Sequence, residues 1–225
     1  VHRYTFPSGR PAHLSMDVTS ALGAKRCKNG RVRVLPDSRE IEGAARLFGT
    51  FSGRYGGLDA YCVARFSAPF QGFSTWDTSK AVAGRAEAAG DSVGCDVWFE
   101  PRAGNNGIEI RVGLSYVSIE NARLNLDAEA GSQSFEILAA DAGARWEGVL
   151  ARIRVEGGTT EQRRIFYTRL YNAFVMPTTF NDVNGEYLGF DRTVHRADGF
   201  TYYTDMSLWD TFRTVHPLYN LIARA

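Results

Sequence analysis

The sequence predicts a mainly β protein, an antiparallel β-sandwich that is followed by helices. Residues 1 to about 130 form short segments of alternating apolar and polar residues, separated by Gly, Pro, Asn and Asp. The 23 glycines, 14 phenylalanines, 10 tyrosines and 4 tryptophans are typical of many turns between half-buried strands. Further along the chain, apolar residues recur at helical spacing instead. Many short strands followed by helices indicate a sandwich with a helical continuation.

The clearest strand lies at Ile108–Tyr116, where apolar residues alternate with Glu, Arg, Gly and Ser. A period of two places the apolar side chains on a core and the others toward water. Cys95–Glu100 precedes this strand and Asn105–Gly107 lies between, so we expect a β-hairpin with a glycine-assisted turn. Asp59–Phe66 and Glu40–Phe51 are further strand candidates.

Two helices are predicted after this strand-rich region. The first has apolar residues at helical spacing, namely Phe135, Leu138, Ala139, Ala142, Trp146 and Leu150. Arg152–Glu156 is a candidate for one last strand, which Gly157-Gly158 would end. The second helix begins at Thr159, because Thr159 and Gln162 fit a capping box, and Pro177 closes it.

Residues 178–206 carry two turn signals, Asn184-Gly185 and Asp198-Gly199. Aromatic residues surround both signals, and we interpret the segment as two β-hairpins or a structured loop. The run from Asp182 to Gly185 also has the spacing that opens a calcium loop. Thr193 stands where such a loop needs its glutamate, so we predict a plain turn.

A third helix is predicted from Ser207, with Asp210 as its capping carboxylate and Pro217 as a kink. Its apolar face continues as far as Ala225. A lone amphipathic helix has nothing to bury that face against. We therefore expect the chain to be a piece of a longer protein, cut inside a helical domain.

Charge and composition argue against several classes of protein. The 26 Lys and Arg against 25 Asp and Glu give a net charge of +1, whereas a duplex-binding surface usually has a basic excess, so nucleic acid is not an expected partner. Hydrophobic residues at 44% and charged residues at 23% argue against intrinsic disorder. No apolar run approaches the roughly 18 residues of a membrane span. The chain opens without a basic-then-apolar leader, which was either never present or already removed.

The residue types that most often carry catalysis or metals form no familiar pattern here. Motifs of the GxSxG, P-loop, HExxH and GxGxxG kinds are missing from the sequence. No two of the four histidines are spaced as metal ligands usually are; they are His2, His13, His195 and His216. Three cysteines without a CxxC allow at most one disulfide, and we interpret them as buried thiols: Cys27, Cys62 and Cys95.

Residues 160–220 combine aromatic rings with carboxylates, amides and a guanidinium group. Sugars present apolar C–H faces and hydroxyl groups, so a sugar site needs both kinds of side chain. Trp209-Asp210 at a helix start supplies both side by side. The alternative is that the rings form core and that Asp210 only caps the helix.

Several runs of the sequence are distinctive. They are RIFYTRLYNAFVMPTTFNDVNGEYLGFDRTVH, YYTDMSLWDTFRTVHPLYNL, SGRYGGLDAYCVARFSAPF with its paired glycines, and VGLSYVSIENARLNLDAE. They resemble family 92 of the glycoside hydrolases, the exo-acting α-mannosidases. The resemblance extends over nearly the whole chain, in the correct order.

The resemblance implies an N-terminal β-sandwich over 1–156, a helical linker over 157–177, and hairpins with the first helix of a truncated (α/α)6 barrel over 178–225. It implies inverting hydrolysis of terminal α-mannosides, aided by a calcium ion that is bound mainly by residues beyond this chain. The catalytic acid and base are also expected beyond residue 225, so the 225-residue chain is expected to be inactive. Expected partners are mannose-containing glycans and the rest of the same polypeptide, and the expected location is secreted or periplasmic.

The resemblance places the early part of a mannose pocket in this chain. It implies hydrogen bonding and packing at the non-reducing mannose by Asp191, Trp209 and Asp210. Arg213 is a candidate for orienting a carboxylate, and Trp76 for shaping the leaving-group side, with core packing as the alternative for Trp76.

Two other hypotheses stay open. The chain could be a β-sandwich module that binds glycans without cleaving them, or a structural module. It could also be a nicked fragment that remains docked to its partner piece. A carboxylate-bearing helical domain encoded after residue 225 would favour the enzyme.

Overall fold

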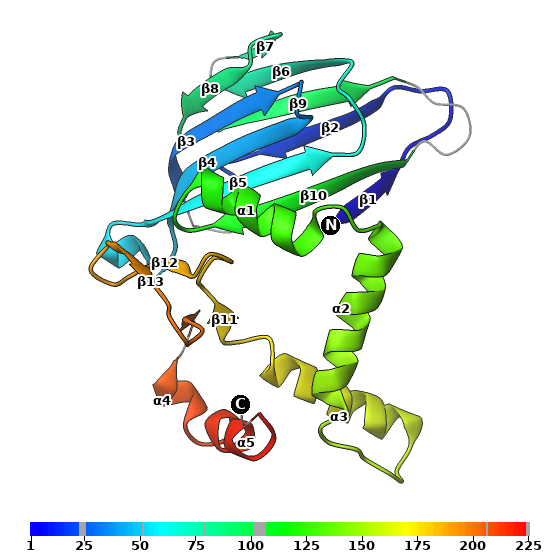
Figure 1. Cartoon of the computed structure of the whole chain (residues 1–225), viewed down its shortest axis with the longest axis vertical. Coiled ribbons are helices and arrows are strands. Elements are labelled where there is room, and N and C mark those ends of the chain that lie inside the picture. The colour runs from blue at the N-terminus through cyan, green and yellow to red at the C-terminus, as the bar shows by residue number, and fades with distance from the viewer. Residues whose placement is uncertain (23–25, 51, 79, 101–106, 206, 224–225) are drawn as a thin grey trace. The chain divides into compact units, whose positions relative to one another are not determined.

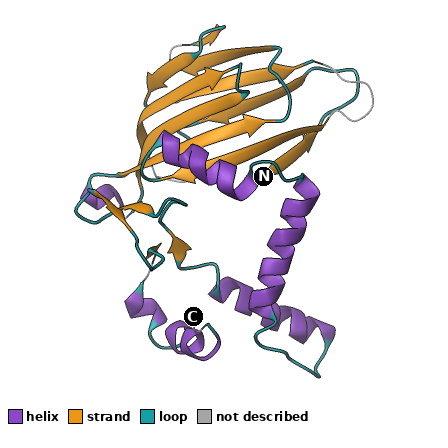
Figure 2. Cartoon of the chain, viewed as in Figure 1, coloured by secondary structure: helices purple, strands orange, loops and turns teal. Residues whose placement is uncertain are grey.

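The computed structural model describes residues 1–22, 26–50, 52–78, 80–100, 107–205 and 207–223. The chain divides into two compact units. Unit 1 consists of Val1–Phe135 and Asp182–Arg196, and unit 2 of Glu136–Asn181 and Ala197–Ala225. The long strands all belong to unit 1 (Figure 2), which confirms the predicted fold class, a mainly β protein with helices after the sandwich.

Unit 1 is built on two antiparallel sheets that face each other (Figure 1). The six-stranded sheet has the order β1 (His2–Thr5), β10 (Gly107–Ser115), β5 (Leu58–Phe66), β4 (Glu40–Phe48), β3 (Arg26–Leu35) and β8 (Glu87–Gly90). The four-stranded sheet has the order β2 (Ala12–Asp17), β9 (Val93–Phe99), β6 (Gly72–Asp77) and β7 (Ala81–Ala83). A short 3-10 helix, η1 (Ser52–Tyr55), follows β4.

The main core fills the space between the two sheets. Its largest fully buried side chains include Phe99 from the four-stranded sheet and Ile41 and Ile108 from the other. Phe66, Phe70 and Phe99 pack in a ring cluster with centroid separations of 5.1 to 5.8 Å. The strands contribute every second residue to this core, as the alternating pattern predicts.

The predicted hairpin between Cys95–Glu100 and Ile108–Tyr116 is wrong. β9 pairs with β2 and β6 in the four-stranded sheet, whereas β10 pairs with β1 and β5 in the six-stranded sheet. The chain therefore crosses from one sheet to the other between these strands, and residues 105 and 106 of the expected turn lie outside the described residues. Alternation indicates which side chains face a core, but both sheets share that core, so it cannot say which sheet a strand joins.

Sequence reasoning missed the helix α1 (Ile119–Ala130), which was included in the strand-rich region. Ser118 caps it by accepting a hydrogen bond from the Asn121 backbone N–H at 3.0 Å. The helix packs across the outer face of the six-stranded sheet (Figure 1), where Ala122 and Leu126 are buried against Val63 of β5. β5 is therefore covered on both faces.

The same helix changes the burial pattern of β10. Val112 and Leu114, predicted to face the core, are 38% and 63% exposed, whereas Gly113 between them is buried. A Cβ on Gly113 would lie 2.0 Å from the Ala122 carbonyl oxygen, so only glycine lets the helix approach this closely. The prediction for this half of β10 is wrong because a helix, not the second sheet, covers the strand there.

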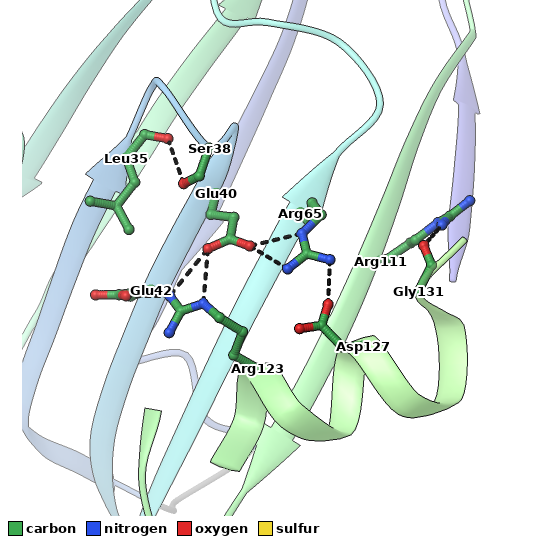
Figure 3. A network of polar contacts seen from close by, with 9 residues as sticks. All are labelled: Leu35, Ser38, Glu40, Glu42, Arg65, Arg111, Arg123, Asp127 and Gly131. Carbon is green, nitrogen blue, oxygen red and sulfur yellow. Dashed lines mark hydrogen bonds and ion pairs between the residues drawn. The ribbon is translucent and has the colours of Figure 1, made fainter. Parts of the chain in front are cut away.

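A polar network fixes α1 to the sheet beside the apolar contact (Figure 3). The carboxylate of Glu40 is 3% exposed and accepts hydrogen bonds from Arg65 at 2.8 Å and from Arg123 of α1 at 3.1 Å. Arg65 also reaches Asp127 of α1, and Arg123 reaches Glu42. Charges that are this buried are tolerated because each has an oppositely charged partner.

Unit 2 contains the remaining helices and two short strands. They are α2 (Phe135–Leu150, which starts on the last residue of the first segment of unit 1), α3 (Thr160–Ala173), β11 (Thr178–Thr179), β14 (Tyr203–Thr204), α4 (Leu208–Thr211) and α5 (Val215–Ile222). The first two predicted helices are confirmed, including the Thr159–Gln162 capping box of α3. The strand proposed at Arg152–Glu156 is wrong, because this segment is a turn and loop after α2.

The third predicted helix is in fact two helices, separated at Phe212–Thr214. Pro217 does not kink a helix interior. It lies in the first turn of α5, where the backbone N–H that proline lacks has no intrahelical partner to lose. The predicted Asp210 cap also differs in detail, since the Ser207 hydroxyl donates to the Asp210 carboxylate and Ser207 makes no side-chain cap bond to the backbone.

The three cysteines are free thiols, as predicted, with Cys27 and Cys95 buried and Cys62 half-buried. Burial raises the pKa of the Cys62 thiol to about 11 and that of the Cys95 thiol to about 12. Among the described residues, the helices are all too short or too polar to cross a membrane.

Candidate functional site

The segment Asp182–Arg196 belongs to unit 1, although it is far from the sandwich in the sequence. It begins with a tight turn, in which the Gly185 N–H donates to the Asp182 carbonyl at 2.8 Å. It then forms a small hairpin of β12 (Glu186–Leu188) and β13 (Val194–Arg196). The hairpin turn is at Gly189–Arg192, not at Asn184-Gly185 or Asp198-Gly199 as predicted.

The other predicted hairpin is replaced in unit 2 by a pairing of β11 with β14. Asp198-Gly199 lies in the connection between β13 and β14. Turn dipeptides therefore marked changes of chain direction correctly, but not the strands that pair across them.

A buried carboxylate anchors this segment to the sandwich. Asp182 is 6% exposed, and its carboxylate accepts hydrogen bonds from Ser115 of β10 at 2.7 Å and from Asn121 of α1 at 2.8 Å. Its other oxygen accepts from Asn125 of α1 at 2.6 Å. These contacts surround the carboxylate with N–H and O–H donors, an environment that suits a structural anion rather than a cation site.

Glu186 extends the same network toward the surface. Its carboxylate accepts from the side-chain amides of Asn121 at 2.8 Å and Asn184 at 3.1 Å. The hydrogen bond from Asn121, and then that from Asn184, lower the pKa of Glu186. Two carboxylates and the amides between them thus fix the start of the hairpin to α1.

Asp191 stands in the hairpin turn with an exposed carboxylate, 55% of the side chain being accessible. It accepts hydrogen bonds from the Thr193 backbone N–H at 3.1 Å and from the Thr193 hydroxyl at 2.9 Å. The His195 ring nitrogen lies 2.9 Å from the same carboxylate. The backbone bond from Thr193 is the main cause that lowers the pKa of Asp191. Asp191 is therefore a fixed, charged acceptor that faces solvent.

Two glycines bring another loop of unit 1 against this hairpin. Gly56 and Gly57 have φ angles of +83° and +88°, which favour glycine. A Cβ on Gly56 would lie 2.7 Å from a guanidinium nitrogen of Arg192, so the Arg192 side chain lies directly over this backbone. Beside it, Arg46 and Asp59 form a forked pair at 2.6 and 2.8 Å, and the hydrogen bonds from Arg46 lower the pKa of Asp59.

The other predicted site residues belong to unit 2. Trp209 and Asp210 are adjacent on the four-residue helix α4, and Trp209 is 80% exposed. Asp210 and Arg213 are also exposed, and the Arg213 guanidinium lies 5.0 Å from the centre of the Phe212 ring. The aromatic ring of this pair is therefore surface and not core.

Within unit 2, Tyr219 of α5 binds this helix to the end of α3. The Tyr219 hydroxyl shares its one proton between the backbone carbonyls of Ala173, the last residue of α3, and Met176 just after it, the latter at 2.6 Å. Its ring lies 5.4 Å from that of Phe174. Burial raises the pKa of Tyr219, so it keeps its donor proton.

A depression of about 540 Å³ lies on the outer face of the six-stranded sheet. It is lined by β3, β4 and β8 and by the first residues of α1, and both signs of charge are present on its walls, including Arg31, Arg33, Glu42 and Glu87. The predicted site residues are not among those that line it.

Trp76, a candidate for the leaving-group side, lies on the outer face of the four-stranded sheet. Its ring covers Gly94 of the neighbouring strand, because a Cβ on Gly94 would lie 2.3 Å from a ring carbon. Trp76 is half-buried on this outer face, so it is not part of the core between the two sheets.

Metal binding was expected mainly from residues beyond this chain. Within the described ranges, His, Cys, Asp and Glu form no group of three or more that could hold a metal ion. Asp191 and His195 contact each other and Thr193. The described residues therefore do not by themselves fit a calcium site.

Sequence reasoning missed the Asp182 network, although its signal was present. Asp182, Asn184 and Gly185 were interpreted as a plain turn, and they do form one. The partners on β10 and α1 are at least 57 residues away in sequence, and the helix that carries two of them was not predicted. A short-range motif cannot identify partners that only tertiary structure brings near.

Comparison with known protein families gives two matches in sequence order. Residues 1–115 match the glycosyl hydrolase family 92 N-terminal domain, and residues 121–225 match the glycosyl hydrolase family 92 catalytic domain. The second match begins at residue 121, in the first turn of α1, so the helix that packs on the sandwich opens the second match. A search of curated proteins gave no match.

Solved structures resemble nearly the whole chain. A family 92 inverting mannosidase from Bacteroides thetaiotaomicron VPI-5482 is 27% identical with a TM-score of 0.83, over 96% of this chain and 28% of that one. A family 92 α-mannosidase from Bacteroides thetaiotaomicron, also solved with mannoimidazole, is 29% identical with a TM-score of 0.85, over 97% of this chain. The chain spans 28% to 29% of the length of these relatives.

Proposed function

Since the chain belongs to glycosyl hydrolase family 92, we propose that its parent protein is an inverting exo-α-mannosidase that removes terminal α-mannose from glycans. The similar structures described as mannosidases support this activity, and one of them was solved with mannoimidazole. The observation in this chain that carries the proposal is the exposed Trp209-Asp210 pair on α4.

The pair can supply both contacts that a mannose ring needs. The Trp209 ring, 80% exposed, offers an apolar surface for the C–H face of the sugar. The Asp210 carboxylate accepts from the Ser207 hydroxyl, which fixes its orientation while leaving lone pairs for sugar hydroxyls. Arg213, three residues on, is proposed to orient a carboxylate of the complete site.

Asp191 is proposed as a second hydroxyl acceptor at the non-reducing mannose. Its contacts with Thr193 and His195 hold the carboxylate in one orientation, and its lowered pKa keeps it charged. A pre-oriented acceptor costs less conformational entropy when the sugar binds.

Inverting hydrolysis needs a general acid at the leaving oxygen and a general base at a water, about 6.5–9.5 Å apart. We propose that both carboxylates lie beyond residue 225. Calcium would supply an electrostatic template for sugar hydroxyls when bound, and its ligands are proposed to lie mainly beyond this chain as well. The rest of the polypeptide is thus the necessary partner, and export to the periplasm or the medium is the proposed location.

The direct test is Asp210→Ala in the intact protein. We expect kcat/KM for an aryl α-mannoside to fall by about 10²-fold or more, because a positioned acceptor for the reacting sugar is lost. Asp141→Ala, an exposed aspartate on α2, is the matched control and should leave the rate unchanged. An unchanged rate for Asp210→Ala, with an intact fold, would reduce Asp210 to a structural role.

The purified 225-residue chain should show no turnover of the same substrate, with or without calcium. Its missing acid and base would each contribute roughly 10²–10⁴-fold to the rate. Measurable hydrolysis by the chain alone would contradict the proposed location of the catalytic groups.

A further inference from the structure

The outer face of the four-stranded sheet carries two tryptophans in reciprocal positions. β6 and β9 pair so that Gly72 is opposite Trp98 and Trp76 is opposite Gly94. Each indole covers the glycine of the neighbouring strand, since a Cβ on Gly72 would lie 2.4 Å from the Trp98 ring nitrogen. Phe73, Thr75, Cys95 and Val97, which alternate with these residues, face inward.

This arrangement leaves both rings at the surface. A tryptophan over a glycine packs one ring face on the backbone, and the other face is turned away from the sheet. Trp76 and Trp98 are both half-buried, as this geometry requires. Four residues along a strand, at about 3.4 Å each, separate their positions by about 14 Å.

A row of polar groups crosses the sheet between the two rings. Ser15 of β2, Asp96 of β9 and Ser74 of β6 lie side by side on this face. The Ser15 hydroxyl donates to one Asp96 oxygen, and the 7%-exposed Ser74 donates to the other at 3.2 Å. Each carboxylate oxygen still has a lone pair for a further donor.

His13 completes the row of groups beside Trp98. It pairs with Trp98 in the β2–β9 register, and its ring meets the indole edge at a centroid separation of 6.4 Å. Its Nε2 lies 3.6 Å from the Asp96 carboxylate, and 58% of its side chain is exposed. His13 is thus a second polar group available to a ligand on this surface.

We propose that this surface, formed by Trp76, Trp98, Asp96 and His13, is a non-catalytic binding site for a glycan chain. A glycan has apolar C–H faces for the rings and hydroxyl donors for the Asp96 carboxylate between them, and it carries no charge that the site must neutralise. The two rings are far enough apart to contact separate sugar residues of one chain.

Within unit 1, the site is separate from the hairpin that carries Asp191. α1 and the Asp182 network pack on the six-stranded sheet, whereas these tryptophans lie on the outer face of the other sheet. Binding here would hold a polymeric or branched substrate near the enzyme without contacting the sugar being cleaved.

Affinity electrophoresis of the intact protein in gels containing yeast mannan, with xylan and β-glucan gels in parallel, tests the site. We expect retardation by at least one of these glycans, and at least a tenfold weaker affinity for Trp76→Ala/Trp98→Ala. Tyr55→Ala, which removes a 74%-exposed ring elsewhere in unit 1, is the matched control and should bind normally. Hydrolysis of a small aryl α-mannoside, measured in parallel, should be unchanged in Trp98→Ala and in Tyr55→Ala.

Two milder substitutions distinguish a loss of binding from a loss of the fold. Trp98→Phe keeps a ring over Gly72 and should lose affinity only in part, by a few-fold, and His13→Ala should also weaken binding without altering thermal stability. The proposal is overturned if the wild-type protein is not retarded by any of the glycans or if the double variant binds as well as wild type. It is also overturned if the double variant changes the sedimentation mass, which would make this face a protein interface.

Discussion

Each of the two compact units of this chain is stabilised internally, and in a different way. Unit 1 buries an apolar core between two sheets and a second cluster under α1, together with carboxylates that are fully surrounded by donors. In unit 2, Leu170 is the one hydrophobic side chain that is buried among the described residues. The 12-residue helix α1 has three buried residues, whereas the 16-residue helix α2 has none.

The difference shows that helix length and apolar spacing do not measure how strongly an element is fixed. α1 is short and polar, yet Gly113 lets it approach the sheet closely and Glu40 pairs with its arginine. α2 and α5 have apolar faces that the described residues leave largely accessible. Long-range contacts should therefore dominate the stability of unit 1, and local interactions should matter more in unit 2.

The largest expected effect follows from Asp182→Ala. This change leaves the Ser115 hydroxyl and the Asn121 and Asn125 amides without their shared acceptor in a buried site. We expect the free energy of unfolding of unit 1 to fall by about 3–5 kcal/mol in urea denaturation. Asp191→Ala, an exposed aspartate of the same segment, should cost less than about 1 kcal/mol. Equal effects would contradict the distinction between the two carboxylates.

Gly113→Ala should produce the next largest loss. Its Cβ would collide with the Ala122 carbonyl oxygen, and backbone does not move aside cheaply, so we expect a cost of about 2–3 kcal/mol. Gly143→Ala is the matched change in unit 2, since nothing lies within 4 Å of the added Cβ on α2. It should stabilise that helix by about 0.5–1 kcal/mol, measured by thermal unfolding followed by circular dichroism. A loss of stability in Gly143→Ala would show that α2 packs against atoms outside the described residues.

Alkaline pH should weaken unit 1 through its buried thiols. The pKa values of Cys62 and Cys95, about 11 and about 12, lie above the ordinary thiol value of about 8.5. The folded state therefore keeps protons that the unfolded state loses, so the stability is complete below about pH 8.5 and falls as the pH rises toward 11.

The expected slope approaches about 1.4 kcal/mol per pH unit for each thiol between pH 9 and pH 11. Urea denaturation at several pH values, with Cys62→Ala and Cys95→Ala for comparison, measures it. Each variant should show a shallower slope than wild type, and identical slopes would exclude these thiols as the cause.

The smallest effect is expected from Thr159→Ala in unit 2. The variant removes one half of the capping box, in which the Thr159 hydroxyl accepts from the Gln162 backbone N–H at 3.1 Å. We expect a loss of about 1 kcal/mol, visible as lower helicity of α3 on heating. Thr160→Ala, one position inside the helix, should have almost no effect. A much larger loss would show that unit 2 depends on this helix start more than on any tertiary contact.

Much of this protein could be read from short-range patterns. The alternation of apolar residues identified four of the sandwich strands, β4, β5, β9 and β10, and the spacing and caps identified α2 and α3. The runs around Asp191 and Trp209-Asp210 indicated the family, which the domain matches then showed. These features depend on neighbours within a few positions, which is why one sequence suffices for them.

Tertiary structure decided the rest, because the contacts involved join residues that are far apart in the chain. It placed β9 and β10 in different sheets, put α1 over Gly113, and gave Asp182 its partners on β10 and α1. It also aligned Trp76 with Gly94 and Trp98 with Gly72, which no sequence period reveals. Local patterns specify which face of a strand or helix is apolar, whereas the choice of what covers that face depends on the free energy of packing the whole chain.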